Sequence, residues 1–240
     1  MEPDNIGFEI VVARTEAEVE ELRGAWESLQ WNPIGDIDFF LNVTRVRTPK
    51  HARPHVVILF EGGVPAAGLA GRIQSQRMPV KFGYRTLFSV HGGPLRFVYG
   101  GALGKIGPAA ARVLVSEAVA ALDRGEADVA MFDHVPLDGD LLQAVTAHVD
   151  PRRRERAPKI EPHLQLDLPA SYDEVLASLS ANARRNLRRY TKLVPANHEG
   201  RWRVDLYESV DDHDHVLAAM RTVSAKSYHR GLDVGFRDDE

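Results

Sequence analysis

The sequence contains no cysteine, so disulfide bonds, thiolate catalysis and cysteine-ligated zinc sites are all excluded. It has no uninterrupted apolar run long enough to cross a bilayer, and its opening residues, MEPDNIGFEI, lack the apolar centre of a signal peptide. A large excess of one charge is also absent. The net charge of −4 argues against nucleic-acid binding by the whole surface, so any anion site is a local patch. We therefore expect a cytoplasmic protein.

Several catalytic signatures are missing as well. There is no Gly-x-Ser-x-Gly elbow of the serine hydrolases and no Walker A loop. The ten histidines do not have the spacing of a zinc protease. His213 and His215 lie two positions apart on a predicted helix, which separates their side chains by about 200° and argues against a shared metal ion. The sequence therefore predicts no metal cofactor.

What is present is the composition of a globular α/β protein. Apolar residues make up 44% and charged residues 27% of the 240, which suffices for one large core or two smaller ones. Runs of β-branched or alternating residues predict strands at 8–12, 54–60, 64–73, 84–90, 95–99 and 127–132, the last of them central in the sheet. The turn Glu61-Gly62-Gly63 joins 54–60 and 64–73 in a predicted hairpin. Helical periodicity predicts helices at 15–29, 108–122 and 138–149, and Thr15 with Glu18 forms a capping box at the start of the first. This order predicts a mixed sheet with helices on both faces, closed by an alternating strand at Leu164, Leu166 and Leu168.

A glycine-rich segment, Gly100–Gly107, lies between a predicted strand and the helix that begins at Pro108. Glycines at such a turn let backbone N–H groups converge on an anion at the helix N-terminus. Gly101, Gly104 and Gly107 are therefore candidate cofactor-binding residues. A flexible connection with left-handed glycines explains the same pattern.

The stretch Ser171–Leu193, SYDEVLASLSANARRNLRRYTKL, predicts one amphipathic helix that starts with a capping box. Its apolar stripe predicts a buried face that includes Leu179. The opposite face carries five cations with no acidic residue between Asn182 and Lys192, and these are Arg184, Arg185, Arg188, Arg189 and Lys192. The interpretation is either a solvated face or an anion site, since Arg and Lys bind phosphate well.

Asp133 and His134 follow the predicted strand at 127–132, at the end where α/β folds place functional groups. His134 is either a general base or an ordinary histidine at the end of a strand.

Two stretches resemble a known family. The segment Ser171–Leu193 resembles the linker helix of CelD/BcsL-like and FemAB-like acyltransferases, with its aromatic start, a Ser-x-x-x-Arg segment and paired arginines. Val98-Tyr99-Gly100-Gly101 resembles the Tyr-Gly-Gly segment of FemAB-like members. These proteins are tandem arrays of two GNAT (Gcn5-related N-acetyltransferase) folds. The chain departs from the superfamily by lacking the Gln/Arg-x-x-Gly-x-Gly pattern of an active GNAT site.

The resemblance implies a GNAT-like acyltransferase that moves an acyl group from acetyl-CoA or another acyl-CoA to an amine or hydroxyl, in envelope or polysaccharide biosynthesis. The acceptor would be a small molecule, glycan or peptide. It implies CoA phosphates at the glycine turn, with Tyr99, Arg184, Arg185, Arg188 and Lys192 as substrate- or phosphate-binding residues. The resemblance does not identify catalytic residues. Two alternatives stay open: a FemAB-like transferase that uses aminoacyl-tRNA on a peptidoglycan precursor, and a non-catalytic GNAT-like module that binds an anionic partner.

The resemblance also suggests a domain plan. Residues 1–168 would form one complete GNAT-like domain, 169–200 a basic linker helix, and 201–240 the start of a second domain. An alternating strand at 202–206 and a helix after Ser209 repeat the order at the N-terminus. Since the second copy stops early in this sequence, we expect the 240-residue chain alone to have little acyltransferase activity.

Overall fold

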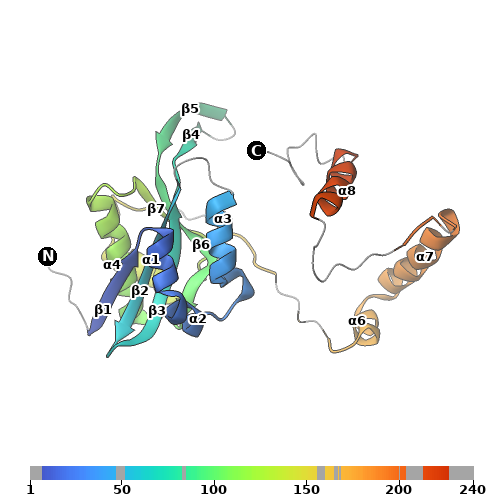
Figure 1. Cartoon of the computed structure of the whole chain (residues 1–240), viewed down its shortest axis with the longest axis horizontal. Coiled ribbons are helices and arrows are strands. Elements are labelled where there is room, and N and C mark those ends of the chain that lie inside the picture. The colour runs from blue at the N-terminus through green and yellow to red at the C-terminus, as the bar shows by residue number, and fades with distance from the viewer. Residues whose placement is uncertain are drawn as a thin grey trace. The chain divides into compact units, whose positions relative to one another are not determined.

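The computed structural model describes residues 7–46, 52–82, 85–155, 160–164, 167, 169–199, 201–203 and 213–226. The chain forms two compact units, Met1–Ile160 and Glu161–Glu240 (Figure 1). Among the described residues, no helix combines the length and apolar character that a membrane crossing requires.

The first unit is built on a five-stranded sheet in the order β1-β2-β3-β6-β7. Its strands are β1 (Phe8–Ala13), β2 (Arg53–Glu61), β3 (Val64–Ile73), β6 (Pro94–Gly104) and β7 (Val129–Phe132). All neighbours pair antiparallel except β6 and β7, which are parallel. Strand β7 was predicted to be central, but it is the edge strand of this sheet as described. The mixed sheet confirms the predicted α/β class.

Helices cover both faces of the sheet (Figure 1). On one face lie α1 (Glu16–Glu21), α2 (Arg23–Leu29), the 3-10 turn η1 (Pro33–Gly35) and α3 (Ile37–Val46). Their buried side chains, such as Trp26 and Leu41, pack with Val56 and Ile58 of β2. The predicted capping box is confirmed: Thr15 accepts from the Glu18 N–H while Glu18 caps in return. The predicted helix 15–29 is divided at Leu22 into α1 and α2.

On the other face, α4 (Pro108–Asp123) packs against the sheet and α5 (Asp140–His148) packs on α4. Val113 and Leu114 of α4 share a core with Val57 and Leu59 of β2. Val56 and Val57 thus serve opposite faces, as side-chain alternation in a strand requires. Helix α4 is the connection between the parallel strands β6 and β7.

A separate two-stranded sheet interrupts the chain between β3 and β6. It consists of β4 (Gln76–Phe82) and β5 (Arg85–Gly92), and Figure 1 shows it projecting from the main sheet. Strand β5 was predicted and β4 was not. The segment QRMPVKF contains a proline and two cations, so its own strand propensity is low. Its pairing with β5 stabilises it as a strand.

The second unit contains three described helices, α6 (Tyr172–Ser178), α7 (Ala181–Asn197) and α8 (His213–Ala225). The predicted single helix at Ser171–Leu193 is therefore two helices. Ser171 caps α6 and Ser180 caps α7, each accepting a backbone N–H. Most of the predicted strands at 164–168 and 202–206, and the cap at Ser209, lie outside the described residues. Val175, Leu176 and Leu179 are only half-buried, and neither α6 nor α7 holds a buried residue, so the predicted buried face is wrong for this unit as described.

Candidate functional site

The site lies where the parallel strands β6 and β7 stop pairing. Their register runs from Pro94↔Val129 to Phe97↔Phe132, and the two phenylalanine rings stack with centroids 4.7 Å apart. Beyond this pair β7 ends, while β6 continues along β3 after a register shift between Leu69 and Gly71. The carboxyl ends of two parallel strands are where α/β folds bring functional groups together.

Two side chains from these strand ends meet directly. The rings of Tyr99 and His134 lie 5.0 Å apart in a T-shaped arrangement. His134 has a backbone φ of 57°, and it is the one described residue other than glycine with a positive φ. A non-glycine residue in this region is strained, and such strain persists where the surroundings fix it, often at functional sites.

A carboxylate lies next to this pair. Asp133 precedes His134, and its Oδ2 is 3.4 Å from the Nε of Arg96 on β6. Arg96 also donates to the sulfur of Met131 at 3.7 Å. The cation therefore links the two strands just before they separate, and it holds Asp133 at the strand end.

The N-terminus of α4 follows β6 and has open backbone donors. Gly107 is the N-cap residue and makes no side-chain cap, while Pro108 occupies the first helical position. The N–H of Ala111 bonds to the Gly107 carbonyl at 2.9 Å, and the N–H groups before it lack helical partners. The first turn of α4 has no acidic residue, and Lys105 is exposed just ahead of it. This end of α4 is suited to an anion.

The three candidate glycines have different environments. Gly101 and Gly104 belong to β6 rather than to a loop, because the strand runs to Gly104 and not to Tyr99 as predicted. A Cβ on Gly101 would lie 2.6 Å from the Ala70 carbonyl oxygen, and Gly104 has a φ of 69°. Packing and backbone conformation therefore explain these two glycines. A Cβ on Gly107 would meet nothing within 4 Å, so only Gly107 lies open at the helix end.

A depression lies beside the same stretch of β6. It has a volume of about 470 Å³ and is lined by Gln30, Trp31, Asn32, Pro33 and Asp36. The Nε1 of Trp31 donates to the Ala102 carbonyl at 2.8 Å, which fixes the depression against the carboxyl half of β6.

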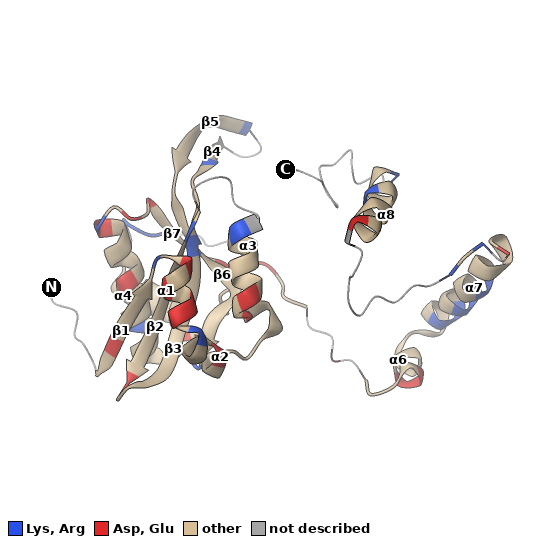
Figure 2. Ribbon diagram, viewed as in Figure 1, with Lys and Arg blue, Asp and Glu red and all other residues tan. Residues whose placement is uncertain are grey.

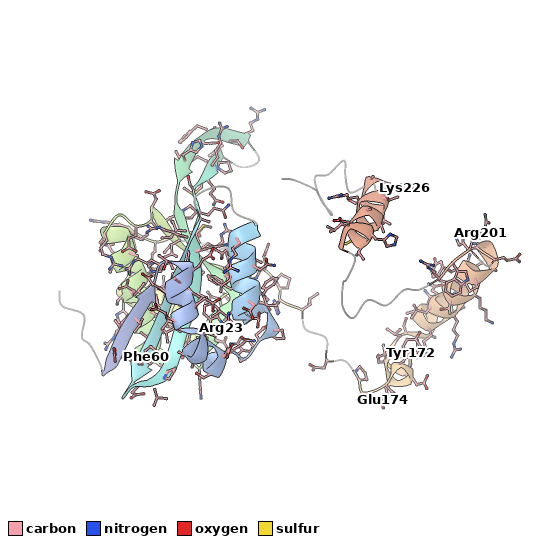
Figure 3. All side chains as sticks on the ribbon, in the orientation of Figure 1. Arg23, Phe60, Tyr172, Glu174, Arg201 and Lys226 are labelled. Atoms are coloured by element: carbon pink, nitrogen blue, oxygen red, sulfur yellow. The ribbon has the colours of Figure 1, made fainter. Side chains whose placement is uncertain are left out.

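The predicted cations lie on α7, in the second unit. Arg185, Arg188, Arg189 and Lys192 are exposed on one face, where Figure 2 shows a row of basic residues. Arg184 differs, because its Nη1 donates to the carbonyls of Ala177 (3.0 Å) and Leu179 at the end of α6. On α6, Tyr172 and Glu174 project outward as labelled in Figure 3. The structure therefore brings Tyr99 together with His134 in one unit and the basic residues together in the other.

A second cluster of titratable groups surrounds His55, near the start of β2, and was not predicted. His55 is fully buried, and neither ring nitrogen has a hydrogen-bond partner among the described residues. Burial lowers the pKa of His55 to about 4, although Glu126 lies 3.5 Å away. Hydrogen bonds from Arg14, and then from Arg124, lower the pKa of Glu126 to about 2. Only the fold brings these distant residues together, so no local sequence pattern could reveal the cluster.

No family model matches the chain. No curated protein matches it either. Its similar solved structures include a ribosomal-protein-alanine N-acetyltransferase from Brucella melitensis biovar Abortus 2308, at 10% identity and a TM-score of 0.35 over 66% of this chain and 99% of that one.

Two further structures are similar to a comparable extent. A transcriptional regulator from Bacillus halodurans C-125 has 10% identity and a TM-score of 0.33 over 65% of this chain and 100% of its own. A protein from Thermus thermophilus has 18% identity and a TM-score of 0.34 over 62% of this chain and 95% of its own. These identities and TM-scores are low, so the proposals below rest on the geometry of this chain.

Proposed function

We propose that the first unit is a GNAT-like acyltransferase that moves an acyl group from acyl-CoA to an amine or hydroxyl. The observation that carries this proposal is the end of the parallel β6–β7 pairing, where Tyr99 and His134 meet. The resemblance noted for the Tyr99-Gly100-Gly101 segment implies a thioester site between two such parallel strands. This reaction needs no metal ion.

The phosphates of the donor would bind at the N-terminus of α4. Gly107 leaves the first-turn N–H groups open, and Lys105 adds a cation beside them. In the second turn, the Nη2 of Arg112 is buried without a hydrogen-bond partner among the described residues. A buried guanidinium nitrogen in this state is satisfied by water or by a bound anion. These features support a pyrophosphate at the α4 end, with Gly107 as its contact.

His134 would act as the general base. The acceptor nitrogen or oxygen attacks the thioester carbonyl carbon, the C–S bond breaks, and His134 takes the proton that the acceptor loses. The CoA thiolate is the leaving group and takes up a proton afterwards. Tyr99 lies against the His134 ring and would hold it in place while contacting the substrate. Asp133, the residue before His134, is held at the end of β7 by Arg96.

The test compares two histidines. His134→Asn retains a residue that tolerates a positive φ, and His148→Asn on the exposed side of α5 is the matched control. We expect acetyl-CoA to raise the melting temperature of all three proteins. CoA release with a panel of amines should fall about 10²–10⁴-fold for His134→Asn alone. Equal turnover by the two variants would show that His134 is not the base.

The sequence-based expectation of low activity for the 240-residue chain is tested in the same assay. Robust turnover by the 240-residue chain would contradict that expectation and would support chemistry in the first unit. Binding of acetyl-CoA without turnover would favour the non-catalytic module.

A second candidate function is favoured by α7. Its face of Arg185, Arg188, Arg189 and Lys192 is exposed and has no acidic neighbour between Asn182 and Lys192. This face suits a phosphate-rich partner, which includes the tRNA of a FemAB-like aminoacyltransferase. Binding of tRNA should then weaken steeply with salt and should be lost with Arg185→Gln, Arg188→Gln and Lys192→Gln together. Salt-independent binding, or none, would remove this candidate.

A further inference from the structure

Among the described residues of the first unit, no helix covers the hairpin of β4 and β5 (Figure 1). Its strands pair with each other from Gln76↔Gly92 to Phe82↔Arg85 and belong to no other sheet. Figures 1 and 3 show the ribbon and its side chains projecting beyond the helices of the first unit. An isolated two-stranded hairpin is marginally stable in water, so contact with a partner would stabilise it.

Apolar side chains gather toward the free end of this hairpin. Phe82 is 79% exposed, Leu87 63%, Phe88 57% and Val90 42%. The pairs Met78↔Val90 and Val80↔Phe88 lie two positions apart, so they share one face of the ribbon. A register shift at Val80/Lys81 leaves Leu87 unpaired next to Phe88. Contiguous exposed apolar side chains of this kind mark an interaction site.

The charge on the hairpin has one sign. Residues 74–93 include Arg77, Lys81 and Arg85 and no aspartate or glutamate. The whole chain carries −4 and these residues contribute +3, so the rest of the chain carries −7. Figure 2 shows basic residues on the hairpin and residues of both signs on the body of the unit. The partner of this surface is therefore both apolar and anionic.

We propose that the β4–β5 hairpin binds the surface of an anionic phospholipid bilayer. Phe82, Leu87 and Phe88 enter the headgroup region, and Arg77 and Arg85 pair with lipid phosphates. The net charge of the remaining residues is negative, so within the first unit we assign this contact to the hairpin. The proposal does not rest on acyl transfer.

A folded protein partner fits this surface less well. The four exposed apolar side chains offer roughly 400 Å² together, whereas a stable interface buries about 800 Å² on each partner. A second copy of the chain would also bring the cations of two hairpins close together. A bilayer needs no matching shape, because lipids rearrange around inserted side chains.

The experiment uses the full 240-residue chain and sedimentation with vesicles of phosphatidylcholine, with or without phosphatidylglycerol. We expect binding only with phosphatidylglycerol. Arg77→Gln, Lys81→Gln and Arg85→Gln together should weaken it on the order of a hundredfold at low salt, since each cation near an anionic leaflet contributes about fivefold. Phe82→Ser, Leu87→Ser and Phe88→Ser together should weaken it about tenfold or more.

Two controls match these variants. Val64→Ser changes an apolar side chain that is 65% exposed at the β2–β3 turn and should leave vesicle binding unchanged. Arg152→Gln removes an exposed cation of the first unit outside the hairpin and should also leave it unchanged. Phe82→Trp gives a readout that does not depend on a disruptive change, because its emission should shift to the blue on vesicles containing phosphatidylglycerol.

Several results would overturn the proposal. These are binding that survives both hairpin variants, binding that only the α7 variant removes, and Phe82→Trp emission that vesicles do not change. Binding of single-stranded RNA in place of vesicles, or a dimer that the hairpin variants dissociate, would assign the surface to another partner.

Discussion

Each unit of this chain contains a long amphipathic helix, but only the helix of the first unit buries its apolar face. In the first unit, α4 buries seven residues against the sheet and α5. In the second unit, α7 is one residue longer and more strongly amphipathic in sequence, yet it has no buried residue, and Leu187, Tyr190 and Val194 are exposed. An apolar stripe therefore predicts which face of a helix could be buried, but burial requires an opposing surface.

The largest expected effect contrasts one leucine from each unit. Leu114→Ala removes a side chain that is fully buried between α4 and the sheet, so we expect the free energy of unfolding to fall by about 2–5 kcal/mol. Leu187→Ala on α7 removes an exposed side chain and should change it by less than about 0.5 kcal/mol. Denaturant unfolding measures both. A comparable loss from Leu187→Ala would mean that α7 is covered in solution.

The next effect is a pH dependence confined to the first unit. Because burial lowers the pKa of His55 to about 4 from an ordinary 6.5, the unfolded chain binds this proton more readily than the fold does. Stability is therefore full above pH 6.5 and should fall by up to about 3 kcal/mol as the pH drops toward 4. Glu126, whose pKa is lowered to about 2, adds a further loss below pH 4.5. Unfolding curves of His55→Leu should lack the loss between pH 6.5 and 4.

Within the first unit, substitutions at two glycines should distinguish an effect on packing from an effect on ligand binding. Gly101→Ala places a methyl group against the Ala70 carbonyl and should cost about 1–3 kcal/mol of stability. Gly107→Ala meets open space and should cost less than about 1 kcal/mol while weakening acetyl-CoA binding. Thermal unfolding and ligand titration measure the two effects. If the Gly107→Ala variant bound acetyl-CoA like the parent, the assignment of the anion site to the N-terminus of α4 would be wrong.

The smallest expected effect concerns the cations of α7. Replacing Arg185, Arg188 and Lys192 by Gln should leave the melting temperature nearly unchanged, because exposed charges contribute little to stability. Arg184→Gln should lower the helicity of the second unit, since Arg184 binds the carbonyls that end α6. Circular dichroism compares the two variants. Equal loss of helicity in both variants would mean that Arg184 contributes no more to helicity than the three exposed cations do.

Local sequence signals predicted most of the first unit. The Thr15 capping box, Pro108 at a helix start and the glycines at a hairpin turn each act within a few residues. Gly62 and Gly63 have φ values of 59° and 81°, the conformation of a tight β2–β3 turn. Such features are readable from sequence because their energetics depend on neighbours along the chain.

Features that depend on distant residues were not predicted. Tyr99 and His134 were each noted separately, but their contact requires the parallel pairing of β6 and β7. The extension of β6 to Gly104 depends on its pairing with β3, which overrides the turn signal of the glycines. The division of α6 from α7 had a usable signal, because Ser180 precedes Ala183 at the spacing of a cap.

The contact of Arg184 with the end of α6 has a mechanical consequence. Helix α6 has seven residues, too few to persist alone in water, and its final carbonyls are held by a guanidinium that belongs to α7. Because arginine keeps its proton at every pH that a protein experiences, this link does not weaken with acidity. The two helices should therefore reorient as one bent rod, with backbone order parameters that stay high across Leu179 and Ser180 instead of dipping at the bend.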